Sequence, residues 1–255
     1  MNGMKFIKRI VGILIVASIS GFLITSSSCK KEEECAYPDL VAADISGSVL
    51  LFDDAKNPMD KNGMLVSIVG SIPLISDTTD ADGNFTLENV DFGNYTLSYS
   101  KDGYGTFLYG VAHQNDCKLV TEVQQFYLGK RSTTAILSLS AEAVAANMHI
   151  DLTVNPAGTA DEPRYVRLFF KKQSDVSNSS YDFQSGILFT ESNALNINLS
   201  PGDMDGMGFV SGETIYLKAY GESYYSNEYY DFFLDRVVFP NTSIVTVPNV
   251  EFIVP

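Results

Sequence analysis

From Asp44 onward, the sequence consists of short stretches in which polar and apolar side chains alternate. Residues 84–87 and 94–99 show the alternation most clearly, and a period of two is typical of β-strands that bury one face. Residues 45–52 and 65–69 are further β-rich runs, and Asp, Asn and Gly residues between the runs favour turns. Because no window of this region carries the apolar stripe of a long amphipathic helix, the sequence predicts an all-β fold.

The same organisation continues to the C-terminus. Further β-rich runs occupy residues 134–138, 148–154, 165–170, 187–190, 195–199, 215–220, 230–238 and 243–247. About eight short strands in a segment of this length predict a β-sandwich of the immunoglobulin or fibronectin type III kind. The alternation falters near Gly129-Lys130-Arg131-Ser132. We therefore predict two β-sandwich domains, at residues 44–130 and 131–255.

Three motifs in the first domain allow a more specific comparison. They are Thr79-Asp80-Ala81-Asp82-Gly83-Asn84-Phe85, then Gly93-Asn94-Tyr95-Thr96-Leu97, then Gly103-Tyr104, and Gly47-Ser48-Val49 precedes them. Together they resemble the carboxypeptidase regulatory-like domain, a transthyretin-like β-sandwich, over about residues 44–130. The resemblance implies an accessory module, distinct from the zinc-bearing catalytic domain of carboxypeptidases.

The motif residues specify a fold rather than a reaction. Gly83 supplies backbone angles that side chains disfavour, and Gly93 and Gly103 predict two further turns. Phe85 and Tyr95 are predicted to place aromatic rings on a buried face.

Acidic residues in the same stretch raise the question of a calcium site. Asp77, Asp80, Asp82 and Asn84 carry oxygen atoms that could bind Ca²⁺. Their spacing departs from the EF-hand loop, in which Gly stands at the sixth position, and their flanks are strand-like. We interpret these residues as turn formers and assign no metal site.

The first 28 residues have the composition of a targeting segment. Lys5, Lys8 and Arg9 precede an apolar run at residues 10–24, and Ser26-Ser27-Ser28 follows it. A positive start, a short apolar core and small residues at the end are typical of a secretory signal peptide. The run is shorter than the roughly 20 residues of a membrane-spanning helix. The alternative is an uncleaved N-terminal anchor helix.

Cys29 directly follows this segment. The sequence before it resembles the lipobox of bacterial lipoproteins, although Ser26 stands where Leu is usual. The resemblance implies cleavage before Cys29 and acylation of its sulfur, and two or three acyl chains bind a membrane firmly. Lys30-Lys31-Glu32-Glu33-Glu34 resembles a surface-export tag of Gram-negative lipoproteins. Residues 29–43 are thus predicted to be a lipidated acidic tether of an outer-membrane protein exposed at the cell surface, with a periplasm-facing anchor as the alternative.

Two cysteines, Cys35 and Cys117, remain besides Cys29. Export places them in an oxidising compartment, where a disulfide between them would stabilise the fold by about 4–5 kcal/mol on the chain-entropy model. The alternative is two free, buried thiols.

The charge of the chain restricts its partners. Its net charge is −14, and all 31 acidic residues lie after residue 28. Such a chain repels nucleic acids at long range, so a nucleic-acid partner is not expected.

The sequence contains few histidines and no recognisable catalytic motif. His113 and His149 are the only histidines, and neither lies in a metal-binding or catalytic motif. Zinc motifs, paired cysteines, nucleophile elbows and phosphate-binding glycine loops do not occur in the sequence. We predict no enzymatic activity and no cofactor, and an enzyme with an unrecognised site is the third hypothesis.

An aromatic patch stands out in the second domain. It comprises Tyr220, Tyr224, Tyr225, Tyr229, Tyr230, Phe232 and Phe233, with polar residues between them. An exposed tyrosine buries its ring against a partner while its hydroxyl stays hydrated, which suits carbohydrate or protein contact. We predict that Tyr224, Tyr225 and Tyr229 contact a ligand. The alternative is that Tyr230 and Phe232 point inward on a strand while the others lie on a loop.

The leading functional hypothesis is a non-catalytic binding or accessory module that contacts glycans or envelope proteins. The alternative is a structural subunit or adhesin of a surface assembly.

Overall fold

The computed structural model describes residue 37 and residues 39–255. The predicted signal peptide, Cys29 and Cys35 lie outside the described residues. The described residues all belong to one compact unit. Within the described part, no helix is long and apolar enough to cross a membrane.

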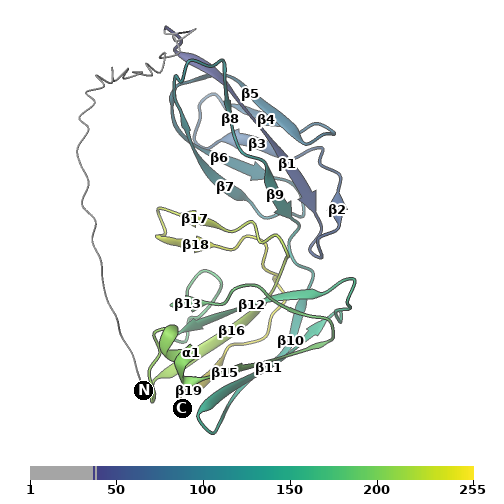
Figure 1. The fold of residues 1–255 in the computed structure, drawn as a ribbon, viewed down its shortest axis with the longest axis vertical. Coiled ribbons are helices and arrows are strands. Elements are labelled where there is room, and N and C mark those ends of the chain that lie inside the picture. The colour runs from purple at the N-terminus through teal and green to yellow at the C-terminus, as the bar shows by residue number, and fades with distance from the viewer. Residues whose placement is uncertain (1–36, 38) are drawn as a thin grey trace, which may run out of the picture. The chain divides into compact units, whose positions relative to one another are not determined.

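The described chain is all-β, as predicted. Its first strands are β1 (Ala42–Phe52), β2 (Pro58–Met59), β3 (Leu65–Ile68), β4 (Ser76–Thr78), β5 (Asn84–Asp91), β6 (Gly93–Ser100), β7 (Phe107–His113), β8 (Val120–Glu122) and β9 (Phe126–Gly129). Strand β1 pairs antiparallel with β2 and β5 and parallel with β8 and β9. The second sheet has the order β4-β3-β6-β7 (Figure 1).

Alternating side chains of both sheets enclose one core, which makes this part the first sandwich. Phe85 and Leu87 reach the core from β5, and Leu97 and Tyr99 reach it from β6. The rings of Phe85 and Tyr99 meet edge to face, with centroids 5.8 Å apart. The predicted period of two is therefore confirmed in these strands. Tyr95, also predicted to face inward, is half-buried against the same core.

Turn residues behave as the motif predicts. Gly83 has φ +85°, and a Cβ added to it would lie 2.3 Å from the Val49 carbonyl oxygen, so a larger residue does not fit. The Asp80 carboxylate accepts hydrogen bonds from the backbone N–H groups of Asp82 and Asn84, each at 2.9 Å. These bonds, led by that from Asn84, lower the pKa of Asp80. Asp80 is thus a turn former.

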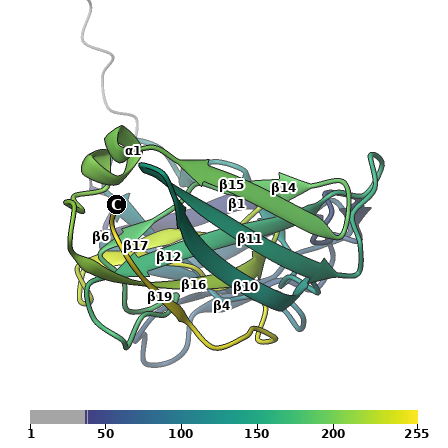
Figure 2. The ribbon, with the colours of Figure 1, turned by 90° about the horizontal axis from the view of Figure 1, so that it is seen from below.

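The second part of the chain forms further sheets. Its elements are β10 (Ala135–Val144), β11 (Asn147–Asn155), β12 (Arg164–Lys171), β13 (Phe183–Gln184), β14 (Leu188–Thr190), β15 (Ala194–Leu199), α1 (Pro201–Gly206), β16 (Thr214–Glu222), β17 (Tyr229–Asp231), β18 (Arg236–Val238) and β19 (Val250–Ile253). The sheet β10-β11-β15 lies over the sheet β13-β12-β16-β19, in which β14 also pairs with β12 (Figure 2). Ile150, Leu168, Leu217 and Phe252 belong to the core between them. We call this part the second sandwich.

Two strand predictions in the second sandwich are wrong. Residues 230–238 form the hairpin β17–β18, because the Asp231 carboxylate accepts the N–H groups of Phe233 and Leu234 and reverses the chain. Residues 243–247 form no strand. Their polar groups bond instead to the backbone of β16, for example from the Ser243 N–H to the Gly221 carbonyl at 2.8 Å.

Cys117 lies between β7 and β8 and is disulfide-bonded. Since Cys35 is outside the described residues, the pairing of these two cysteines stays a prediction.

Candidate functional site

The segment that follows β16 leaves the second sandwich and binds the first. The side-chain amide of Asn227 exchanges two hydrogen bonds with the backbone of Gly129, at 2.8 and 3.0 Å. Asn241 donates to the Gly129 carbonyl at 2.7 Å and accepts the Gly105 N–H at 3.0 Å. Both asparagines are buried. Residues 223–241, which include the hairpin β17–β18, are therefore fixed between two anchor points.

An ionic network centred on the buried Arg167 also contacts this segment. Arg167 on β12 donates to Glu222 at 3.1 Å and to Glu228 at 2.8 Å, and its guanidinium lies 4.3 Å from the ring centroid of Phe239. A third bond goes to the Gln184 side-chain oxygen at 2.5 Å. Because Glu228 directly precedes β17, the network holds the base of the hairpin in place.

Burial shifts the pKa of Glu222 in this network. Desolvation raises its pKa to about 7 although the Arg167 charge acts in the opposite direction. A raised folded-state pKa stabilises the fold fully below the ordinary value near 4.5, and that contribution is lost as the pH rises through 7. We expect the free energy of unfolding to fall by about 1–3 kcal/mol between pH 5 and pH 8 from this group alone.

The measurement is urea unfolding at several pH values. Glu222→Gln should remove this pH-dependent part, whereas Glu251→Gln on the exposed face of β19 should retain it. Equal pH profiles for wild type and Glu222→Gln would refute the assignment.

The three tyrosines predicted to contact a ligand lie at two different places. Tyr225 packs against Phe52 of the first sandwich, with ring centroids 4.5 Å apart, and against Tyr224 at 4.8 Å. Tyr229 meets the edge of Phe107, with centroids 6.3 Å apart. Tyr224 is the most exposed of the three, while Tyr225 and Tyr229 are half-buried at the junction of the sandwiches.

The hairpin β17–β18 carries the most exposed aromatic side chains of the patch. Phe232 is 86% exposed and Phe233 is fully exposed at 101%. Tyr230 is also exposed, and its hydroxyl donates to the Asp235 carboxylate. The alternative in which Tyr230 and Phe232 point inward is therefore wrong, because Tyr229 takes the inward position.

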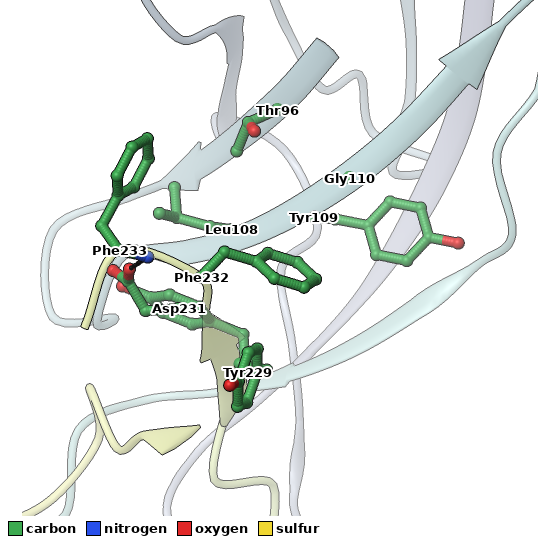
Figure 3. Close-up of a pocket in the computed structure, with 9 residues that line it drawn as sticks. Thr96, Leu108, Tyr109, Gly110, Tyr229, Asp231, Phe232 and Phe233 are labelled. Carbon is green, nitrogen blue, oxygen red and sulfur yellow. Dashed lines mark hydrogen bonds between the residues drawn. The ribbon is translucent and has the colours of Figure 1, made fainter. Parts of the chain in front are cut away.

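A small pocket lies between this hairpin and the first sandwich. Its volume is about 90 Å³, and we call it the hairpin pocket. The residues that line it are Thr96, Leu108, Tyr109, Gly110, Tyr229, Tyr230, Asp231, Phe232 and Phe233. Figure 3 shows the Phe232 ring beside β7, between Leu108 and Tyr109, whereas the Phe233 ring points away from it. Of the tyrosines predicted to contact a ligand, the structure places Tyr229 in the pocket wall.

The pocket is too small to enclose a drug-sized ligand, for which about 300–1,000 Å³ is typical. It can receive one edge of a ring or one side chain, with the remainder of the ligand lying on the surface. Exposed rings stand beside the Asp231 carboxylate and the Thr96 hydroxyl. This combination offers apolar contact and hydrogen bonding within one small area.

Four lining residues come from the first sandwich, and sequence reasoning missed them. Thr96 lies on β6 and pairs with Gly110 on β7. A Cβ added to Gly110 would have nothing within 4 Å. No group approaches this position closely, so Gly110 does not mark the pocket, and the sequence offered no signal for these four residues.

His113 has a structural role in the first sandwich. It is fully buried, and its ring nitrogens lie 2.7 Å from the Thr121 hydroxyl and 3.0 Å from the Val90 carbonyl oxygen. Among the described residues, no three His, Cys, Asp or Glu side chains are grouped to hold a metal ion.

No protein-family model matches the chain, and neither does any curated protein. Among solved structures, it is similar to a DUF3823 family protein from Parabacteroides merdae ATCC 43184, at 12% identity and a TM-score of 0.31, over 84% of this chain and 100% of that one. A DUF3823 family protein from Bacteroides ovatus ATCC 8483 gives 8% identity and a TM-score of 0.31 over 84% and 100%. The major pilin SpaD from Corynebacterium diphtheriae gives 11% identity and a TM-score of 0.27 over 83% and 65%. Similarities at this level assign no function.

Proposed function

We propose that this protein is a non-catalytic accessory module that binds a glycan through the hairpin β17–β18 and the hairpin pocket. The observation that carries the proposal is the exposure of Phe232 and Phe233 on a segment that is anchored on both sides. Exposed apolar side chains that cluster, as Phe232 does with Tyr230 at 5.0 Å between ring centroids, often mark an interaction site.

The chemistry of the pocket favours a sugar over a purely apolar partner. A sugar ring has an apolar C–H face, which stacks on aromatic rings, and a rim of hydroxyls, which needs hydrogen-bonding groups. Phe232 offers the first surface, and Asp231 and Thr96 offer the second. The anchoring of the hairpin limits the conformational entropy that binding would cost.

The rest of the chain is suited to presenting this binding site at the cell surface. We propose that Cys29 anchors the protein in the outer membrane with the site facing outward. In this proposal the first sandwich, which resembles the carboxypeptidase regulatory-like domain, acts as a rigid spacer and supplies one wall of the pocket.

Changing Phe232 to Ala should weaken glycan binding by about tenfold, since a central aromatic anchor is worth over 1 kcal/mol. The full chain, purified in detergent, would be screened on a glycan array, and its affinity for the best glycan measured by calorimetry. The melting temperature should stay within about 1 °C, because the ring is exposed.

Phe189→Ala is the matched control, since Phe189 is 58% exposed on β14 of the second sandwich. Its affinity should equal that of the wild type. If Phe232→Ala binds glycan as well as the wild type, the site is wrong. If no glycan on the array is retained while an envelope protein co-purifies through Phe232, the glycan assignment is wrong and the structural-subunit hypothesis is favoured.

A further inference from the structure

The hairpin pocket opens onto a sheet face of unusual composition. Side chains of β3, β4, β6 and β7 alternate between the core and solvent. The solvent side includes Ser67, Thr96, Ser98, Leu108 and Gly110, with Ser, Thr, Asn, Leu or Ala at its other positions. All of these strand residues are described, and none on this side is charged. We call this surface the neutral face.

A charge-free face is unexpected on this chain. The net charge is −14, and 19% of all residues are charged. A solvated sheet face ordinarily takes its share of those charges. The neutral face carries hydroxyl and amide groups instead, which indicates a surface adapted to an uncharged hydrogen-bonding partner.

Two depressions lie along this face. One is the hairpin pocket, beside Thr96 and Gly110. The other is lined in part by Leu65, Ser100 and Thr106. Thr96 and Ser100 lie four residues apart on β6, which corresponds to roughly 13 Å along a strand. Lys101 and Asp102 border the second depression and Asp231 borders the hairpin pocket, so the charged residues at both depressions come from outside the strands of the neutral face.

Other classes of occupant fit this face poorly. Protein interfaces are enriched in large aromatic and Arg side chains near their centres, whereas the centre here holds Ser67, Ser98 and Gly110. An anionic polymer needs basic residues, and the strand residues on this side of the sheet include none. Lys101, at the second depression, already donates to the Asp60 and Asn62 carbonyls. A lipid surface would bury hydroxyls without partners.

We infer that the neutral face is a track for an extended, uncharged polysaccharide that also occupies the hairpin pocket. This inference rests on the proposed function, because the pocket provides the aromatic contact at one end. The strand hydroxyls then provide a row of hydrogen-bonding groups for the hydroxyls of successive sugars. The substrate class is a long neutral chain, not a single terminal sugar or an acidic glycan.

The test compares polymers with their own fragments. The full chain would be titrated with xylan, galactomannan, amylose and laminarin, with short oligosaccharides from each, and with polygalacturonate as the anionic polymer. We expect at least tenfold tighter binding of one neutral polymer than of its fragment, per binding site, and no binding of polygalacturonate.

The variant Ser100→Glu tests the track independently of the hairpin pocket. It places a charge at the far depression without altering any residue of the hairpin pocket. We expect it to weaken polymer binding at least fivefold and to leave fragment binding unchanged. Ala143→Glu, which adds the same charge at an exposed position of β10, should change neither.

The outcomes distinguish the two proposals. If Ser100→Glu leaves polymer binding unchanged while Phe232→Ala abolishes it, the track is rejected and the pocket stands. Preference for polygalacturonate also rejects the track. If none of these polymers or fragments binds, the inference fails, and the glycan array decides the proposed function separately.

Discussion

At pH 8, above the pKa of about 7 to which burial raises Glu222, replacing Arg167 by Met lowers the free energy of unfolding by about 3–5 kcal/mol, the range observed when one partner of a buried ion pair is removed. Arg167 is 2% exposed, and Glu222 beside it is 0% exposed. The variant leaves the Glu222 carboxylate buried without its nearest cation. Methionine fills much of the same volume, so the loss reports on charge and hydrogen bonding rather than on a cavity.

Urea unfolding at pH 8, where Glu222 is mostly ionised, measures this effect, and Lys172→Met is its control. Lys172 pairs with Glu213 at 2.8 Å near the surface, where an ion pair contributes less than about 1 kcal/mol. The double variant Arg167→Met/Glu222→Gln should regain part of the loss, because the uncompensated carboxylate is gone. A loss below about 1 kcal/mol for Arg167→Met would show that Glu222 is already neutral and that the network is not an ion pair at this pH.

The same variant has a consequence for binding. Glu228 loses its bond to Arg167, and its other side-chain bond is with the nearby Ser226 hydroxyl. Since Glu228 precedes Tyr229, the base of the hairpin becomes less fixed, and glycan affinity should decrease together with stability.

Strands with one buried face were predictable from the sequence. Phe85, Leu87, Leu97 and Tyr99 alternate with polar residues, and each turns inward on a regular strand. Local patterns suffice where burial follows a period of two.

The hairpin β17–β18 was not predictable in this way. Residues 229–238 are apolar or aromatic at many successive positions. The pattern of polar and apolar residues therefore does not predict where the chain turns. The turn arises from bonds of the Asp231 carboxylate to two backbone N–H groups, which depend on side-chain geometry.

The hairpin pocket could not be predicted from the sequence for a different reason. Thr96 and Gly110 belong to the first sandwich, whereas Phe232 belongs to the second half of the chain. They meet because Asn227 and Asn241 bind the backbone of the first sandwich. Such long-range contacts leave no local pattern, and an asparagine in a turn-like sequence does not reveal that it is buried.

Asn241→Ala should lower the free energy of unfolding by about 2–4 kcal/mol, because it removes buried hydrogen bonds and leaves backbone groups without partners. Asn241 is fully buried, and its side chain bonds to Gly105, Gly129 and Tyr225. The Gly129 carbonyl keeps its bond from Asn227. The Gly105 N–H and the Tyr225 carbonyl lose theirs, so the cost falls on the contact between the two sandwiches.

Asn249→Ala is the matched control, since the half-buried Asn249 makes one side-chain bond, from its amide to the Ser174 carbonyl at 2.7 Å. It should cost less than about 1 kcal/mol. If Asn241 couples the sandwiches, Asn241→Ala should also separate their unfolding into two transitions, followed by hydrogen exchange at Leu97 in the first core and at Leu217 in the second. Exchange that slows or quickens equally in both cores would contradict this coupling. Asn241→Ala should then also bind glycan more weakly, although Phe232 is unchanged. The reason is that the hairpin and the first sandwich, which form the two walls of the hairpin pocket, are no longer held together.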